Sequence, residues 1–186
     1  MFKKEVRIIA WDDCEFKFNS KSVTVVGVIF RGGQFLDGLL SIKIAKDGLD
    51  ATEKISSAIN SSRHYDQLSL IMLDGITFAG FNMVDIKELR KRTELPVIVV
   101  QRDKPNMKEF LKAMKRFDNY SKRKDMVRSA GKIYSYKDVY YQKSGLADSD
   151  CEQILDLTCV RSKVPEPIRV AHIIASGLSG ESRGGA

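Results

Sequence analysis

Three short strand-like segments are each followed by charged residues, and this feature most narrows what the chain can fold into. The segments are Glu5–Ala10, Leu68–Leu73 and Pro96–Val100, and the charged residues that follow them are Asp12, Asp74 and Arg102. Short runs rich in β-branched residues and bounded by polar ones are typical of strands. Strands that are apolar throughout are buried on both faces, as in parallel sheets covered by helices. We therefore expect a sheet whose buried strands end in charged side chains.

The remaining segments supply a hairpin and helical connections. Strands are predicted at Ser22–Phe30 and Phe35–Ala45, joined by the turn Arg31-Gly32-Gly33. Helices are expected at about 50–62, 83–93, 106–117, 148–159 and 167–176, with a short strand at 133–142. The segment Asp50-Ala51-Thr52-Glu53 has the form of a capping box, so the Asp50 carboxylate is expected to accept hydrogen bonds at the helix start.

This order of elements predicts an α/β fold with a mixed sheet. Three antiparallel strands come first and are extended by parallel strands through helical crossovers, which is the ribonuclease H-like arrangement, with helices flanking the sheet. No internal repeat or linker divides the chain. We therefore expect a single domain over residues 1–178, with residues 179–186 as a flexible tail.

Composition excludes several classes of protein. Among the 186 residues, 43% are hydrophobic, yet no apolar run reaches the length that spans a bilayer, so no membrane association is expected. The start lacks the pattern of a secretory signal, and the three cysteines show no CxxC spacing, which favours reduced thiols in a cytoplasmic protein. The net charge of +7 suits a polyanionic partner.

Carboxylates follow two of the predicted central strands. Ligand sites in open α/β sheets lie at the carboxyl ends of strands, so Asp12 and Asp74 are expected to meet there. Carboxylates gathered at one point repel each other unless a cation is present, and hard oxygen ligands suit Mg²⁺ or Mn²⁺. Asp47 or Asp50, in KDGLDAT, is the candidate for a third carboxylate. The alternative is that each Asp caps the turn after its strand.

Basic residues are concentrated between Lys104 and Lys132. The candidate phosphate contacts in this stretch are Lys122, Arg123, Lys124 and Arg128, interleaved with aromatic residues. The alternative is a solvated helix face. The C-terminal glycines match neither a Walker pattern nor GxGxxG after a strand, so no nucleotide cofactor is expected.

The last predicted helix carries two polar residues of interest. His172 lies among apolar neighbours and is either packed in the core or catalytic. Arg169 precedes it by three positions, so the two share a helix face. We expect the helix to pack beside the strand ends, with Arg169 in a structural salt bridge and His172 turned towards the carboxylates.

Six ordered segments carry a resemblance that covers nearly the whole chain. They are IIAWDDCEF, VVGVIFRGG, DGLDAT, LDGITFAGFNMVD, PVIVVQRDKP and PEPIRVAHIIASG. Together they resemble the endonuclease dU family of archaeal proteins and, more distantly, endonuclease V. The resemblance implies that Asp12 and Asp74 are metal-binding carboxylates. Arg102 falls where endonuclease V has a catalytic lysine, and His172 falls where some members place a histidine near the metal.

Departures from endonuclease V limit what the resemblance transfers. In place of the glutamate of its Phe-Arg-Glu segment this chain offers Asp47 or Asp50 in a different context, and it lacks the Pro-Tyr wedge and the His-Pro-Arg run after Asp-Gly. Inosine recognition is therefore not transferred.

The function implied is that of an Mg²⁺-dependent endodeoxyribonuclease of DNA repair. Its expected substrate is DNA containing a deaminated base, with deoxyuridine suspected. The main alternative is a nucleic-acid-binding protein of the same fold without catalysis. A further alternative is a small-molecule enzyme with a phosphorylated substrate.

Overall fold

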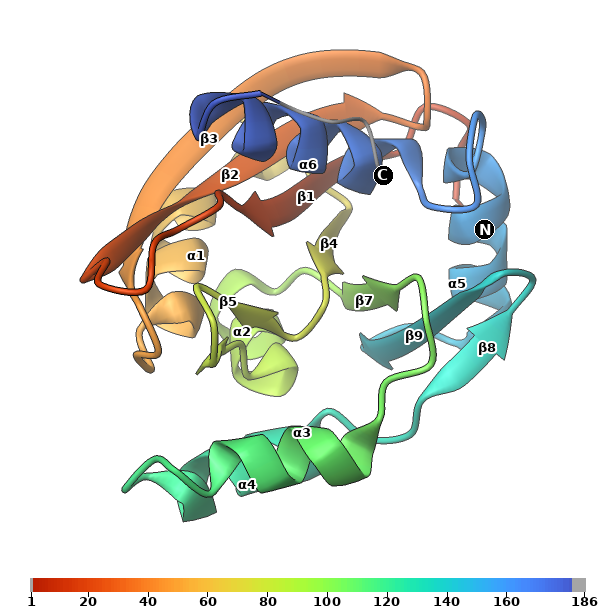
Figure 1. Cartoon of the computed structure of the whole chain (residues 1–186). Coiled ribbons are helices and arrows are strands. Elements are labelled where there is room, and N and C mark those ends of the chain that lie inside the picture. Colours follow the sequence, from red (N-terminus) through yellow and green to blue (C-terminus); the bar gives the residue numbers. More distant parts are fainter. Residues whose placement is uncertain (1, 182–186) are drawn as a thin grey trace.

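A seven-stranded mixed sheet forms the centre of the protein, in the order β3-β2-β1-β4-β7-β9-β8 (Figure 1). The computed structural model describes residues 2–181. The strands are β1 (Arg7–Asp13), β2 (Ser22–Arg31), β3 (Phe35–Ala45), β4 (Leu70–Asp74), β7 (Val97–Gln101), β8 (Tyr134–Tyr136) and β9 (Val139–Ser144), and a separate two-stranded sheet pairs β5 (Thr77–Phe78) with β6 (Asn82–Met83). The helices are α1 (Ala51–Asn60), α2 (Ile86–Thr93), α3 (Met107–Met114), α4 (Tyr120–Ser129), α5 (Asp148–Thr158) and α6 (Glu166–Leu178), with a short 3-10 turn at Tyr65–Gln67.

Strand pairing confirms the predicted ribonuclease H-like arrangement. β1, β2 and β3 are antiparallel neighbours, and β4 and β7 extend the sheet in parallel with β1. The hairpin of β8 and β9 completes the sheet beside β7. Figure 1 shows α6 on one side of β1 and β2, with α1 and α2 on the other side, and α3 and α4 at the lower end. None of the helices in the described part of the chain has the length and apolar character needed to cross a membrane.

Three elements differ from the prediction. The helix predicted from residue 83 begins at Ile86, because the Asp85 carboxylate accepts from the amides of Lys87 and Glu88 at 3.1 Å. The strand predicted at 133–142 is instead the hairpin of β8 and β9, and the turn between them contains Lys137 with a left-handed φ of 49°. The helix predicted at 106–117 is α3, which ends at Met114, and the following helix α4 was not predicted.

The predicted capping role of Asp50 is wrong. Its side chain makes no cap hydrogen bond to α1 and turns back to accept from the Ala45 amide at 3.1 Å and from Asn82 Nδ2 at 2.6 Å. The amide of Ala51 at the helix start donates instead to Asn82 Oδ1, at 3.0 Å. A residue distant in sequence therefore caps the helix, which local spacing could not reveal.

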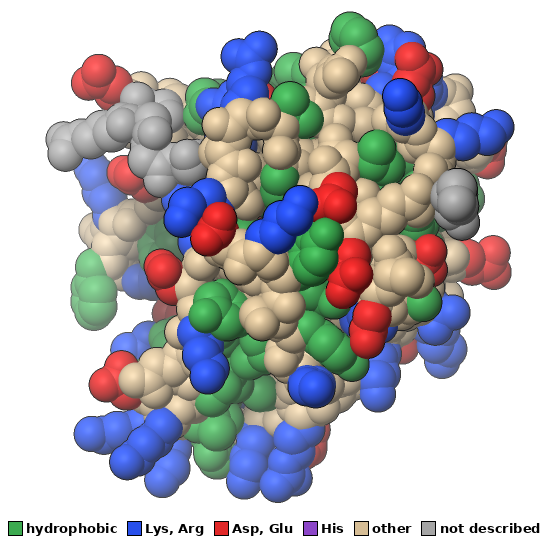
Figure 2. Space-filling model, turned by 90° about the vertical axis from the view of Figure 1, so that its right-hand side faces the viewer, with side chains coloured by type: hydrophobic (Ala, Val, Ile, Leu, Met, Phe, Trp, Pro, Cys, Tyr) green, Lys and Arg blue, Asp and Glu red, His purple; other side chains and the backbone are tan. Residues whose placement is uncertain are grey.

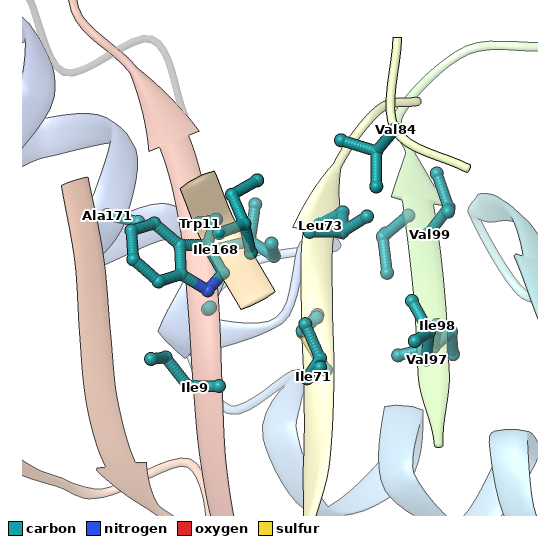
Figure 3. Packing of buried hydrophobic residues seen from close by; sticks show 14 of the residues in the cluster. Ile9, Trp11, Ile71, Leu73, Val84, Val97, Ile98, Val99, Ile168 and Ala171 are labelled. Atoms are coloured by element: carbon teal, nitrogen blue, oxygen red, sulfur yellow. The ribbon is translucent and has the colours of Figure 1, made fainter. Parts of the chain in front are cut away.

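The core runs across the central strands (Figure 3). Ile9 and Trp11 of β1, Leu73 of β4 and Val99 of β7 are all inaccessible to solvent. Burying each such side chain contributes about 1.5–3 kcal/mol relative to leaving it exposed. The helix α6 buries the small residue Ala171 and contacts β1, β2 and β4. This packing fixes the helix that carries His172. The predicted flexible tail from residue 179 lies, over 182–186, outside the described residues.

Candidate metal centre

Two parallel strands and one helix bring three potential ligands together. Trp11 pairs with Leu73 across β1 and β4, so the residues that follow them, Asp12 and Asp74, lie side by side at the strand ends. His172 reaches the same point from α6. One ligand atom from each of these three side chains lies within 4.8 Å of the others, and no other such group exists among residues 2–181. The sequence predicted all three residues for this site.

Hydrogen bonds hold this arrangement in place. His172 Nδ1 lies 2.8 Å from Asp12 Oδ2, and Asp12 Oδ1 accepts from the Asp13 amide at 2.8 Å. The Asp13 carboxylate accepts from the Ala79 amide at 2.7 Å. Arg102 Nη2 lies 3.8 Å from Asp74 Oδ2. The predicted Arg102 therefore follows β7 and faces the same carboxylates.

Burial raises the pKa of every carboxyl group at this point. Desolvation, reinforced by the charges of Asp74 and Asp13, raises the pKa of Asp12 to about 8. Desolvation also raises the pKa of Asp74, although Arg102 and His172 oppose the shift. Two carboxylates held together in this way retain their negative charges more easily once a cation lies between them. The donor set of two carboxylates and an imidazole therefore fits a divalent cation.

An open cleft of about 480 Å³ gives access to these groups. Its lining also includes Arg102 and Asp103, which follow β7, and Glu15 and Phe16, which follow β1. Sequence reasoning did not single out Phe16. The available signal was the alternation of aromatic residues and lysine directly after the first strand, in Phe16-Lys17-Phe18.

Asp47 and Asp50 do not join the group of ligand atoms formed by Asp12, Asp74 and His172. Asp47 adopts a left-handed φ of 53°, and its carboxylate accepts from the Phe81 amide at 2.9 Å. The Asp50 carboxylate is bonded to Ala45 and Asn82. Both side chains therefore hold loops together, and the structure does not bring the predicted third carboxylate to the centre.

Arg123 is the predicted phosphate contact that the structure contradicts. Only 1% of the residue is exposed, and its guanidinium donates to the carbonyl oxygens of Phe81 and Asp47 and to Asn119 Oδ1. The guanidinium also lies 4.4 Å from the centre of the Phe117 ring. These hydrogen bonds from Nε, Nη1 and Nη2 of a buried guanidinium fasten α4 to the loops that contain Phe81 and Asp47.

The other predicted phosphate contacts lie at the surface of α4. Lys122 and Arg128 are exposed, and Lys124 is half-buried with its ammonium 5.9 Å from the Tyr120 ring centre. Figure 2 shows Lys and Arg side chains gathered at the lower end of the molecule, the level at which Figure 1 places α3 and α4. Their positions are compatible with binding a polyanion.

Arg169 confirms the prediction of a structural salt bridge. Its Nε and Nη2 donate to the two carboxylate oxygens of Glu166, at 2.8 and 2.6 Å. These hydrogen bonds hold the pKa of Glu166 below its usual value. This bidentate pair braces the first turn of α6, one turn before His172.

Comparison with known proteins connects this site to a family. The family model for endonuclease dU matches residues 4–179. A UPF0215 protein of Methanothermobacter thermautotrophicus is 48% identical over 190 residues, which cover 99% of this chain and 93% of the relative. Thus the similarity extends over nearly the whole chain.

Solved structures agree with the fold. A protein of unknown function from Archaeoglobus fulgidus superposes with a TM-score of 0.88 at 39% identity, covering 93% of this chain and 98% of that one. Endonuclease V of Ciona intestinalis, solved with DNA containing an inosine, gives a TM-score of 0.58 at 13% identity, covering 89% and 82%. The second similarity supports the fold alone. With the family model and the archaeal relative, these findings show that the chain belongs to the endonuclease dU family.

Proposed function

We propose that the protein is an Mg²⁺-dependent endonuclease that hydrolyses phosphodiester bonds in DNA containing a deaminated base. The observation that carries this proposal is the convergence of Asp12, Asp74 and His172 in an open cleft at the strand ends. The family name supports deoxyuridine as the first base to test. DNA as the polymer is supported by the endonuclease V structure of the same fold, which contains DNA. A role in DNA repair follows if a deaminated base directs cleavage.

Each residue of the cleft has a distinct part in this proposal. Asp12 and Asp74 hold the cation through their carboxylate oxygens. A bound divalent cation supplies charge neutralisation at the phosphodiester and activation of the attacking water. Arg102 stabilises the negative charge that grows on the phosphate oxygens, since its guanidinium already faces Asp74. Asp12 orients the His172 ring through Nδ1, which leaves Nε2 to accept or deliver a proton.

The basic surface of α4 extends the same proposal beyond the cleft. Lys122, Lys124 and Arg128 contact phosphates of the bound strand and contribute affinity without reading sequence. Arg123 is not part of this contact, because its guanidinium is buried. In this proposal the cleft hydrolyses the phosphodiester, and the surface of α4 binds the strand without sequence specificity.

A panel of oligonucleotides tests the proposal. Single- and double-stranded DNA and RNA, each with uracil, inosine or no lesion, are incubated with the full chain in Mg²⁺, in Mn²⁺ and in a chelator. We expect cleavage of deoxyuridine-containing DNA that requires the metal and that Asp12→Asn abolishes. Metal-dependent cleavage of every substrate at one rate would reject the lesion specificity. Binding of DNA without cleavage in any metal would reject the nuclease and support the non-catalytic alternative.

A further inference from the structure

The loop between β1 and β2 presents two aromatic side chains to solvent. Phe16 is 38% exposed and Phe18 is 95% exposed. Large apolar side chains in the open are common singly, but neighbouring ones at the edge of a cleft mark a binding surface. Phe16 lines the cleft that contains Asp12 and His172, and Phe18 lies two residues further along the same loop. The exposed rings therefore adjoin the candidate metal centre.

Hydrogen bonds give this loop a defined shape. The Ser20 amide donates to the Lys17 carbonyl at 3.0 Å, and the Lys17 amide donates to Ser20 Oγ at 3.1 Å, which closes a tight turn around Phe18. Lys46, which follows β3, donates its ammonium to the Phe18 carbonyl. The exposure of Phe18 is therefore imposed by the fold of the turn at its tip.

Lysines lie beside the two rings, whose loop also carries the exposed Glu15. The Lys46 ammonium lies 4.7 Å from the centre of the Phe18 ring and 5.7 Å from that of Phe16. Lys17 and Lys21 on the same loop are exposed. A partner that suits this surface offers a flat apolar face together with negative charge. Nucleobases on a phosphate backbone combine these two properties.

We propose that Phe16 and Phe18 form a stacking surface for an unpaired nucleobase of the substrate strand, beside the phosphodiester to be cleaved. This inference rests on the proposed nuclease function and names the part of the substrate that the loop recognises. Lys46 contributes its charge to the adjacent phosphate and keeps the rings in place. Because every base has an aromatic face, the contact positions the strand without selecting one base.

The chain offers a matched control for this surface. Phe35 is 49% exposed and lies with its ring centre 5.3 Å from the Arg31 guanidinium, so it also combines an exposed ring with a cation. Arg31 pairs with Arg7 at the start of β1, at the end of the strand opposite Asp12. Phe35 therefore reproduces the chemistry of the loop at a place remote from the cleft.

Fluorescence of introduced tryptophans tests stacking directly. The only native tryptophan, Trp11, is fully buried, so a tryptophan at position 18 or 35 reports its own surroundings. We expect single-stranded DNA, added in a chelator, to quench Phe18→Trp and to leave Phe35→Trp unchanged. Inorganic polyphosphate, which carries the charge without bases, should quench neither variant. Equal responses of the two variants to DNA, or equal quenching of Phe18→Trp by polyphosphate, would overturn the proposal.

Binding and cleavage by alanine variants separate this inference from the proposed function. Phe18→Ala should weaken binding of single-stranded DNA by about 5-fold or more, the lower range for the loss of one base–aromatic contact, while Phe35→Ala binds as the native chain does. Phe18→Tyr should restore most of the affinity. If the native chain binds and cleaves DNA but Phe18→Ala matches Phe35→Ala, only the stacking surface is rejected. If the native chain neither binds nor cleaves, both proposals fail.

Discussion

The protein contains two pairs of acidic residues that look alike in sequence and differ in the structure. Asp12 and Asp74 end parallel strands in an open cleft, where burial and mutual repulsion raise the pKa of Asp12 to about 8. Asp47 and Asp50 lie in a loop where the amides of Phe81 and Ala45 donate to their carboxylates. The first pair lies beside a potential ligand, His172, and the second pair lies among hydrogen-bond donors of the chain.

The difference teaches how a carboxylate site for a cation is distinguished from a carboxylate used in the fold. Amide donors stabilise the charge of Asp47 and Asp50 within the protein, so these side chains need no further partner. Asp12 and Asp74 lie close enough to repel each other, and a cation or a proton relieves that repulsion. Substitutions in the two pairs should therefore have opposite consequences for activity and stability.

The largest effect is expected from exchanging one carboxylate in each pair for an amide. Asp74→Asn should lower the metal-dependent cleavage rate by about 100-fold or more, because a ligand charge is lost while the shape remains. Asp50→Asn should keep the rate and lower the free energy of unfolding by about 1 kcal/mol, because one acceptor of a partly buried network is lost. Cleavage rates and thermal melts of both variants check this, and full activity of Asp74→Asn would remove the metal assignment.

The stability of the protein should depend on pH because of Asp12 and Asp74. The pKa of Asp12 is raised in the folded protein, so the folded state binds a proton that the unfolded chain has released. In a chelator, we expect the free energy of unfolding to be highest below about pH 4 and to fall as pH rises from about 4 to about 8. The expected loss is on the order of a few kcal/mol. Added Mg²⁺ or Mn²⁺ should raise the melting temperature at pH 8 and leave it unchanged at pH 4.

Asp12→Asn supplies the control for this dependence. The variant has no charge to develop at position 12, so its melting temperature should vary less with pH and respond less to the metal. A native chain whose melting temperature is the same at pH 5 and pH 8 in chelator would contradict the expected destabilisation by charged Asp12.

Substitutions at two residues of α6 should have separate effects, one on the cleavage rate and the other on the stability of the protein. His172→Ala should lower the cleavage rate by about 10- to 100-fold, the lower range for a lost acid–base group, with little change in melting temperature. Arg169→Ala should lower the free energy of unfolding by about 1–3 kcal/mol, because buried Glu166 loses both hydrogen bonds of its carboxylate. Chemical denaturation and single-turnover rates on the same preparations make the comparison. A loss of stability in His172→Ala equal to that in Arg169→Ala would indicate that the histidine only packs.

The smallest effect concerns the salt dependence of DNA binding. Changing Lys122, Lys124 and Arg128 together to alanine should weaken binding to all sequences alike and reduce the slope of log affinity against log salt by about 2 to 3. The matched control changes Lys3, Lys4 and Arg63, which are exposed and precede β1 and β4 at the end of the sheet away from the cleft. Equal slopes for the two triple variants would identify the α4 surface as a solvated face.

Much of the fold could be predicted because apolar runs and helix periods are local properties of the chain. The same apolar runs made the positions of Asp12 and Asp74 predictable, because a residue just after a buried strand lies at the edge of the sheet. The functions of Asp50 and Arg123 could not be predicted, because their partners lie far along the chain. Asp50 bonds to Asn82, and Arg123 bonds to Phe81 and Asp47. Charge alone favoured a surface position for Arg123, whereas distant carbonyl acceptors determined a buried one.

The buried guanidinium of Arg123 also has a consequence for how the protein unfolds. It joins α4 to the backbone at Phe81 and Asp47, so these three segments cannot separate without exposing unpaired polar groups. We therefore expect backbone amides of α4 and of the two loops to exchange hydrogen with solvent in a single opening event, although up to 76 positions separate them along the chain. In Arg123→Met, those segments should open independently, and α4 should exchange first. The surface of α4 is thus fastened to the loops that follow β3 and β5 as one cooperative unit.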